Sequence, residues 1–256
     1  MTEPTRDAPT DDSVRDKRVV ITGAGRGLGR WLATAFSQRG ARVALVARTQ
    51  ADLTTLADEL PGETLVCPAD VTDEADNERV ADTVVDTWGG LDVWIANAGI
   101  SPVVASPLEI DPAVWREILD VNLTGSFLGA RAAARAMTAG GRIIFTGSVL
   151  GERPIRGLGA YSTTKAGLVG LAKSLAVDLA PQGINVNVVA PGWFDSPLAE
   201  GWTSNPKLSA RITDHTVQRR WGVESDLVGA YLFLASDASA FITGTVVNVD
   251  GGYLLV

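Results

Sequence analysis

A tyrosine and a lysine stand four residues apart in this chain, at Tyr161 and Lys165. The apolar residues around them recur at helical spacing, which predicts a helix over residues 160–181 with both side chains on one face. An ammonium about 4 Å from a tyrosine is worth roughly 4 kcal/mol, or about three pKa units. Such a tyrosine could exchange protons near pH 7. This spacing also occurs often by chance, and the alternative is a surface tyrosine beside a solvated lysine.

A glycine-rich turn separates a predicted strand, residues 19–22, from a predicted helix that starts near Trp31 and precedes a second strand, residues 43–47. The turn contains Gly23, Arg26, Gly27, Leu28 and Gly29. Glycines allow the backbone to approach a pyrophosphate, which the free amides and the helix dipole attract. The spacing G-x-x-x-G-x-G departs from the common G-x-G-x-x-G fingerprint. A plain strand-to-helix turn is therefore the alternative.

The residues after the second strand indicate which dinucleotide the turn would bind. An NAD site uses a carboxylate there to hold the ribose 2′-hydroxyl, and that carboxylate repels a 2′-phosphate. Here Arg48 follows the strand, and no acid occurs before Asp52. Arg48 and Arg26 could make charge-assisted contacts with a 2′-phosphate. The pattern favours NADP(H), with two surface arginines as the alternative.

The chain continues as alternating strands and helices. Strand patterns cover residues 64–67, 91–96 and 142–146, and helical patterns cover 73–88 and 112–137. This alternation predicts an α/β fold: one Rossmann-type, doubly wound parallel sheet of about seven strands with helices on both faces. A ligand is expected at the carboxyl ends of the strands.

Several polar residues fall at those strand ends or near them. Asp70 and Asn97 follow two of the predicted strands directly, and Asn122 lies within the helical pattern. Asp70 could equally cap a turn, and Asn122 could be a packing feature.

Composition excludes several classes of function. The net charge is −8, without basic blocks, which argues against nucleic-acid and anionic-membrane partners. One cysteine, Cys67, and one histidine, His215, cannot form a disulfide framework or a zinc site, so no metal is expected. No apolar run is long enough for a membrane span, and residues 1–16 do not read as a signal peptide. We expect a disordered tail over 1–16, one catalytic domain over 17–256, and a cytoplasmic protein.

Taken together, these residues resemble the short-chain dehydrogenase/reductase family over residues 17–252. The matching positions are Thr22-Gly23, Gly27, Gly29, Asp70, Asn97-Ala98-Gly99, Asn122, Ser148, Tyr161, Lys165, Pro191-Gly192 and Val249-Asp250-Gly251-Gly252. The chain departs from the usual family pattern at Ser196, where threonine is frequent, and at Ala96, where a second asparagine is frequent.

The resemblance implies a role for each of these residues. Tyr161 would be the general acid and base, and Ser148 would hydrogen-bond the reacting oxygen. Lys165 would lower the tyrosine pKa and hold the nicotinamide ribose, and Asn122 would position a water for proton return. The remaining implied cofactor contacts are Asp70 and Val71 at the adenine, Asn97 and Gly99 along the cofactor, Pro191 and Gly192 below the nicotinamide, and Ser196 at the carboxamide.

The resemblance also implies a homotetramer, and it leaves alternatives open. A regulator that senses the dinucleotide without catalysis is one alternative. A reductase of carbonyls carried on acyl carrier protein is another, although basic docking residues are lacking near the helices concerned.

A substrate lid is expected over residues 193–226, which contain Trp193 and Trp202 and have little strand character. Aromatic walls favour an apolar or ring-shaped ketone. Arg153 and Arg156, which lie between Ser148 and Tyr161 in sequence, favour a sugar acid of the gluconate 5-dehydrogenase type if they reach the pocket mouth.

Overall fold

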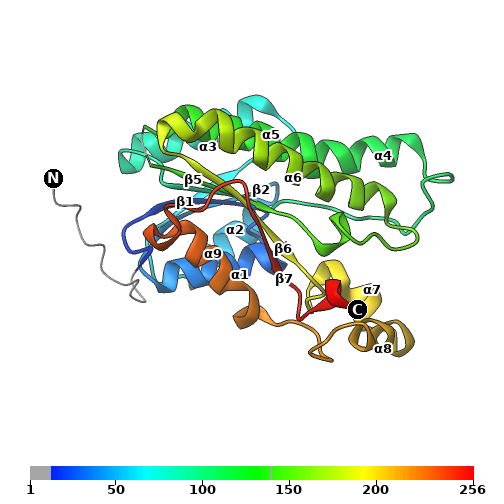
Figure 1. Ribbon diagram of the computed structural model, residues 1–256. Coiled ribbons are helices and arrows are strands. Elements are labelled where there is room, and N and C mark those ends of the chain that lie inside the picture. The colour runs from blue at the N-terminus through cyan, green and yellow to red at the C-terminus, as the bar shows by residue number, and fades with distance from the viewer. Residues whose placement is uncertain (1–12, 139) are drawn as a thin grey trace.

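The computed structural model describes residues 13–138 and 140–256, and its centre is a parallel sheet (Figure 1). Within these residues the sheet has seven strands in the order β3-β2-β1-β4-β5-β6-β7. Their bounds are β1 Arg18–Thr22, β2 Arg42–Ala47, β3 Thr64–Pro68, β4 Val93–Ala96, β5 Arg142–Thr146, β6 Asn185–Pro191 and β7 Val246–Val249. The predicted doubly wound sheet is therefore confirmed.

Helices cover both faces of the sheet (Figure 1). One face carries α1 (Gly27–Gln38), α2 (Gln50–Glu59) and α9 (Glu224–Ala235). The other carries α3 (Glu74–Trp88), α4 (Pro112–Leu119), α5 (Gly125–Ala136) and α6 (Gly159–Leu179). Two short helices, α7 (Glu200–Thr203) and α8 (Pro206–Asp214), lie near the C-terminus in the picture.

The strands are apolar along nearly their whole length because both faces of the sheet are buried. Strand β5 has no exposed residue, and alternate side chains enter two separate hydrophobic cores. Phe145 packs in the core under α3, α5 and α6, whereas Ile144 packs in the core under α1 and α9. This two-sided burial fixes the register of the strands, and so it fixes which side chains emerge at their carboxyl ends.

The predicted helix over 112–137 is interrupted. Between α4 and α5 the backbone widens into a π-helical segment, Asp120–Thr124, in which the amide of Gly125 reaches the carbonyl of Asp120. Asn122 lies in this segment and is fully buried. Wide turns of this kind are frequent at functional sites.

The folded domain begins before Lys17, which corrects the predicted tail of 1–16. Residues 13–16 form a turn, and the side chain of Val14 is fully buried in the core under α1. The Asp16 amide donates to the Gly40 carbonyl at 2.9 Å. The rest of the predicted tail, residues 1–12, lies outside the described residues.

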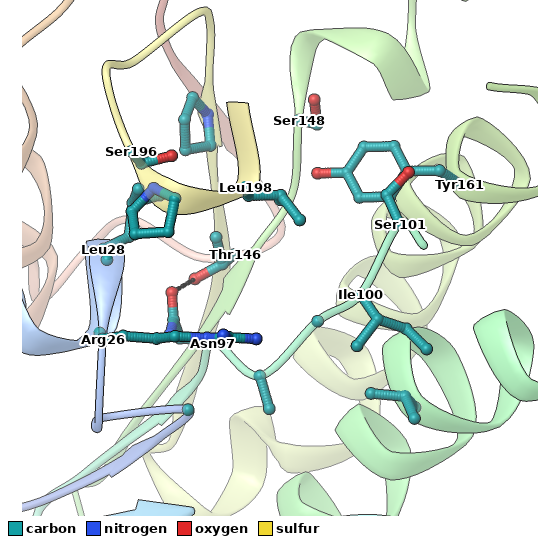
Figure 2. Close-up of a pocket in the computed structure, with 18 of the residues that line it drawn as sticks. Arg26, Leu28, Asn97, Ile100, Ser101, Thr146, Ser148, Tyr161, Ser196 and Leu198 are labelled. Carbon is teal, nitrogen blue, oxygen red and sulfur yellow. Dashed lines mark hydrogen bonds between the residues drawn. The ribbon is translucent and has the colours of Figure 1, made fainter. Parts of the chain in front are cut away.

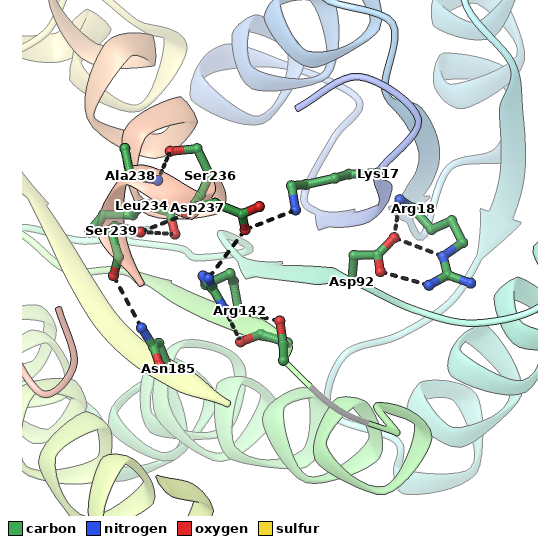
Figure 3. Close-up of polar contacts among 12 residues, drawn as sticks. Lys17, Arg18, Asp92, Arg142, Asn185, Leu234, Ser236, Asp237, Ala238 and Ser239 are labelled. Atoms are coloured by element: carbon green, nitrogen blue, oxygen red, sulfur yellow. Dashed lines mark hydrogen bonds and ion pairs between the residues drawn. The ribbon is translucent and has the colours of Figure 1, made fainter. Parts of the chain in front are cut away.

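Charged side chains join the amino ends of the strands (Figure 3). Arg18 at the start of β1 pairs with Asp92 before β4, with 2.6 Å between Nη2 and Oδ1. Burial acts to raise the pKa of Asp92, but the hydrogen bonds from Arg18 hold it below its usual value. Asp237 lies between Lys17 and Arg142, at 3.7 and 3.6 Å. The charges at this edge are thus paired with one another, and the opposite edge carries the cleft described below.

The segment predicted as a lid folds across the carboxyl ends of β6 and β7. An isolated bridge joins Phe194 to Gly222, and the Gly222 amide donates to the Trp193 carbonyl at 2.9 Å. In the sequence, helices α7 and α8 lie between Phe194 and Gly222, which agrees with the prediction of little strand structure in this segment. None of the described helices has the length and apolar character that crossing a membrane requires.

Candidate active site

A cleft of about 680 Å³ runs along the carboxyl ends of the strands. It brings together all of the residues that the sequence analysis assigned to the site except Asn122. They are Gly23, Arg26, Gly27, Leu28, Gly29, Arg48, Asp70, Val71, Asn97, Gly99, Ser148, Tyr161, Lys165, Pro191, Gly192 and Ser196. Figure 2 shows the Tyr161 hydroxyl pointing into this space, with Ser148 beside it and Leu198 across from it.

The glycine turn forms one end of the cleft with bare backbone. Gly23 and Gly27 have φ angles of +69° and +54°, which side-chain-bearing residues rarely adopt. A Cβ on Gly29 would come within 2.1 Å of the Gly23 carbonyl oxygen. Helix α1 begins at Gly27, so its free amides and its positive dipole end face the cleft. This geometry suits a pyrophosphate.

Asn97 holds the end of β4 against its neighbours and is itself a wall of the cleft. Its Nδ2 donates to the Thr22 carbonyl at 2.9 Å, and its Oδ1 accepts from Thr146 Oγ1 at 3.3 Å (Figure 2). The Thr22 hydroxyl in turn accepts from the amides of Asn97 and Ala98. The sequence analysis did not identify these positioning roles of Thr22 and Thr146.

Two arginines and one carboxylate line the cleft near the glycine turn and the end of β2. Arg26 and Arg48 line the cleft and are exposed. Asp52, the first acid after the second strand, also lines the cleft, because the first turn of α2 brings it against Gly25. The site therefore contains an acid as well as the predicted bases.

Asp70 and Val71 follow β3 and form the next wall. Asp70 Oδ1 accepts from the amide and the hydroxyl of Thr72 at 2.9 and 2.8 Å, which is a capped turn. The amide of Asp70 donates to Asp76 at 2.8 Å. The alternative interpretation of Asp70 as a turn cap is confirmed, and its expected contact with the adenine stays a prediction.

Tyr161 and Lys165 share a face of α6 as predicted, and burial is the main influence on the pKa of each. Burial raises the pKa of Tyr161 to about 12, and a hydrogen bond with Ser148 opposes this rise. The Lys165 ammonium donates to the Thr146 carbonyl at 2.7 Å and lies 5.4 Å from the centre of the tyrosine ring. Burial lowers the lysine pKa to about 8. The expected lowering of the tyrosine pKa by Lys165 stays a prediction.

Asn122 supports the cleft from behind and does not line it. Its Oδ1 accepts from the Ile100 amide at 2.7 Å, and its Nδ2 donates to the Ile100 carbonyl at 2.9 Å. The same Nδ2 lies 3.3 Å from Thr164 Oγ1. The side chain therefore fixes the backbone that follows Gly99 to helix α6. Its expected role in proton return stays a prediction.

Pro191 and Gly192 end β6 and form the floor of the cleft. A Cβ on Gly192 would lie 2.7 Å from the Cα of Asp250, so only glycine fits there without movement. The Gly192 amide donates to the Val249 carbonyl at 2.8 Å. Ser196 stands four residues further on, at the start of a short turn of helix, Pro197–Ala199.

A third hydrophobic cluster lies around Tyr161, apart from the two cores of the sheet. Its buried members are Val149, Leu150, Leu158 and Tyr253, and Ile155, Tyr161, Trp193, Trp202 and Leu254 pack against them. The rings of Trp193 and Trp202 lie 5.2 Å apart. These residues come from distant parts of the chain, and the sequence analysis identified only the tryptophans among the walls of this end.

Neither arginine between Ser148 and Tyr161 lines the cleft, so the condition for a carboxylate site at Arg153 or Arg156 is not met. Arg153 Nη1 donates to the Tyr253 carbonyl at 2.9 Å, and its guanidinium lies 5.3 Å from the centre of the Tyr253 ring. Arg156 is exposed and is not among the cleft residues. Among the described residues, no group of histidine, cysteine or acidic side chains could hold a metal ion.

Comparison with known proteins places this geometry in context. The family profile described as enoyl-(acyl carrier protein) reductase matches residues 23–254. Cis-4-hydroxycyclohexanecarboxylate dehydrogenase of Sinomonas cyclohexanicum is 35% identical over 249 residues, covering 96% of this chain and 99% of the relative. The 3-oxoacyl-(acyl-carrier-protein) reductase FabG of Escherichia coli (strain K12) is 35% identical over 242 residues, covering 94% and 98%.

Solved structures agree with these matches. A putative short-chain alcohol dehydrogenase from Sinorhizobium meliloti 1021 superposes with a TM-score of 0.91 at 35% identity, covering 96% of this chain and 99% of that one. A gluconate 5-dehydrogenase from Burkholderia cenocepacia J2315, in complex with NADP and tartrate, gives a TM-score of 0.90 at 32% identity, covering 96% and 99%.

Proposed function

This chain belongs to the short-chain dehydrogenase/reductase family of oxidoreductases, and from that premise we propose that it interconverts a ketone and a secondary alcohol with NADP(H). The observation that carries the proposal is the meeting of Ser148, Tyr161 and Lys165 on the same cleft as the bare glycine turn. One end suits a dinucleotide, and the other holds a proton donor.

Bound NADP(H) supplies or accepts the hydride in this reaction. In reduction, Tyr161 Oη donates its proton to the carbonyl oxygen, and the Ser148 hydroxyl hydrogen-bonds that oxygen as its charge develops. The Lys165 ammonium lies on the tyrosine ring and stabilises the phenolate that remains. The carbonyl of Thr146 holds the ammonium in place. In oxidation the same tyrosine oxygen receives the proton.

The residues at the nucleotide end fit NADP(H). The close approach of Gly29 to Gly23 leaves backbone amides open to a pyrophosphate. Arg26 and Arg48 offer two positive charges to a 2′-phosphate, against the single negative charge of Asp52. The solved gluconate 5-dehydrogenase structure, which holds NADP, supports this choice by similarity.

Two other enzymatic readings have support from relatives but less from the site. FabG and the matched family profile favour a carbonyl carried on acyl carrier protein. Gluconate 5-dehydrogenase favours a sugar acid, but Arg153 points to Tyr253 and leaves no base for a carboxylate at that position. A regulator without catalysis is disfavoured because all four expected catalytic residues are present.

The test is reduction of an activated aryl ketone, followed by the absorbance of NADPH. We expect turnover with NADPH, and we expect Tyr161→Phe to lower it by about 10³-fold, because the ring remains and only the acid is lost. NADPH binding, measured by calorimetry, should stay within about twofold, a change of less than 0.5 kcal/mol. A protein that binds NADPH but reduces no ketone would be a regulator.

We also propose that the protein is a homotetramer. Leu255 and Val256 at the C-terminus are 81% and 54% exposed, and Phe127 on α5 is 38% exposed, which is unusual for such apolar side chains in a monomer. Light scattering at micromolar concentration tests this, and a monomer would contradict it.

A further inference from the structure

The charged residues of the cleft are gathered at its nucleotide end, with the exception of Lys165. They are Arg26, Arg48, Asp52, Asp70, Glu117 and Lys165. All but Lys165 lie in the glycine turn, directly after β2 or β3, in the first turn of α2, or on α4. Lys165 is buried and already donates to the Thr146 carbonyl. Among the described residues, the wall around the Tyr161 hydroxyl therefore carries no side chain that is free to pair with an anion.

The wall around Tyr161 is made of apolar and aromatic side chains instead. Val149, Leu150 and Leu158 are buried and line the cleft, and so do the partly buried rings of Trp193 and Trp202. The two rings are tilted by 56°. Apolar surface of this kind is stabilised when it is covered by hydrocarbon, and aromatic faces suit rings.

The rim of the cleft continues this apolar character into solvent. Val104 is 63% exposed and Leu198 is 54% exposed, yet both line the cleft. The loop of Val104 is held in place, since the Ala105 amide donates to the Gly157 carbonyl at 2.9 Å. Figure 2 shows Leu198 extending toward the side on which the Tyr161 hydroxyl lies. A substrate entering here would meet hydrocarbon on two sides.

Resting on the proposed function, we infer that the substrate is an uncharged ketone or secondary alcohol whose larger substituent is an apolar ring packed against Trp193 and Trp202. A carboxylate in that place would lose its hydration without gaining a partner, which is costly. The overall charge of −8 adds no long-range attraction for an anion at this end of the cleft.

Two ring ketones of nearly equal shape test the inference: 4-methylcyclohexanone and 4-oxocyclohexanecarboxylate. Binding is measured by calorimetry on protein saturated with NADP⁺, where no hydride is available, and turnover is measured separately with NADPH. We expect the methyl compound to bind at least tenfold more tightly and to have a kcat/KM at least tenfold higher. Equal or tighter binding of the carboxylate, or no binding of either ring, overturns the inference.

The two measurements separate this inference from the proposed function. If the methyl compound binds preferentially but neither ring is reduced, the substrate class stands and the proposed reaction fails. If the carboxylate is reduced preferentially, the reaction stands and the substrate class fails.

Variants at the rim and the wall sharpen the result. Trp202→Leu should weaken binding of the methyl compound by about tenfold, whereas Leu108→Ala, at a side chain that is 95% exposed and outside the cleft, should not change it. Leu198→Arg places a base at the exposed rim, where folding is not at risk. In this variant the affinity for 4-methylcyclohexanone relative to that for 4-oxocyclohexanecarboxylate should fall at least threefold. The matched Leu198→Met should leave this ratio unchanged. An unchanged preference in Leu198→Arg, or unchanged binding in Trp202→Leu, counts against the inference.

Discussion

The two ends of the cleft differ in what lines them: mainly backbone at one end and mainly large side chains at the other. The nucleotide end consists of backbone: glycines packed so closely that a Cβ on Gly29 would reach 2.1 Å from a carbonyl oxygen. The end around Tyr161 consists of large side chains, such as Trp193 and Trp202, that touch one another through their rings. Backbone contacts cannot be changed without changing the fold, whereas the rings can be replaced individually. The backbone therefore forms the part of the cleft that suits a dinucleotide, and the side chains can adjust the choice of cofactor and substrate.

The largest expected effect tests the backbone half of this comparison. Gly29→Ala should weaken dinucleotide binding by at least about 100-fold and destabilise the protein by about 3 kcal/mol, because its Cβ would overlap the Gly23 carbonyl. Gly229→Ala on α9 is the control, since a Cβ there meets nothing within 4 Å. It should stabilise the protein by about 0.5–1 kcal/mol. Normal NADPH binding by Gly29→Ala would mean that close backbone approach is not required.

Lys165 lies where the two ends meet, and its burial predicts a dependence of stability on pH. Its pKa falls from 10.5 unfolded to about 8 folded, so the unfolded state binds more protons between these values. The free energy of unfolding should therefore rise by up to about 3 kcal/mol as the pH increases from 8 to 10.5. Tyr161 has the opposite effect at higher pH. Because its pKa is raised to about 12, the folded state binds more protons than the unfolded state between pH 10 and 12, and the free energy of unfolding falls over that range.

Urea unfolding at pH 8 and pH 10 measures the contribution of Lys165 to the free energy of unfolding, because Tyr161 acts only above pH 10. Lys165→Met should remove most of the rise, and Lys173→Met, at an exposed position of the same helix, should keep it. An identical rise in both variants would show that another group is responsible.

Arg48 and Asp52 give a paired test of charge at the nucleotide end. Arg48→Asp should lower the preference for NADP(H) over NAD(H) by about 100-fold, because it adds repulsion and removes a charge-assisted hydrogen bond worth about 1.5–3 kcal/mol. Asp52→Asn should raise the preference by a few-fold, which is below about 1 kcal/mol. Arg211→Asp makes the same charge change on α8, outside the cleft, and should have no effect. Equal use of both cofactors by the unaltered protein would contradict the assignment of both arginines.

The smallest expected effect concerns the hydrogen bond between Thr146 and Tyr231, which supports both ends of the cleft. Tyr231 is fully buried, and its hydroxyl lies 2.8 Å from Thr146 Oγ1. Thr146→Val should cost about 1–3 kcal/mol, since it leaves the tyrosine hydroxyl without its partner, and Tyr231→Phe about 1 kcal/mol. The double variant should be more stable than the sum of the single losses predicts. Additive losses in urea unfolding would show that the two hydroxyls are independent.

Much of the fold was predictable because the strands are buried on both faces, so that they appear in the sequence as continuous apolar runs. Strand β5 was predicted to its exact ends, 142–146. The glycine turn was also predictable, since only glycine meets its backbone constraints. Sequence spacing could not show the tertiary contacts. Arg153 lies close to Tyr161 in sequence, yet its side chain donates to the Tyr253 carbonyl.

The electrostatics of the site were also beyond sequence reasoning. Spacing on a helix brings Lys165 near Tyr161, but it cannot say how deeply both are buried. The rise in the tyrosine pKa follows from that burial. Asp52 was missed for a related reason, because the first turn of α2 folds it back to Gly25, which no count of residues after the glycines reveals.

The π-helical segment Asp120–Thr124 changes the rotational phase of everything that follows it. One extra residue in a turn advances a helix by about 100°. Downstream of it, Gly125 and Gly129 face inward, where a Cβ would lie 2.9 Å from Val71 and from Trp94. Asn122 stands three residues before Gly125 and seven before Gly129, so all three positions lie on the same face of the helix. Deleting one residue between Asn122 and Gly125 should therefore rotate Asn122 by about 100° relative to the glycines and turn it away from the Ile100 amide.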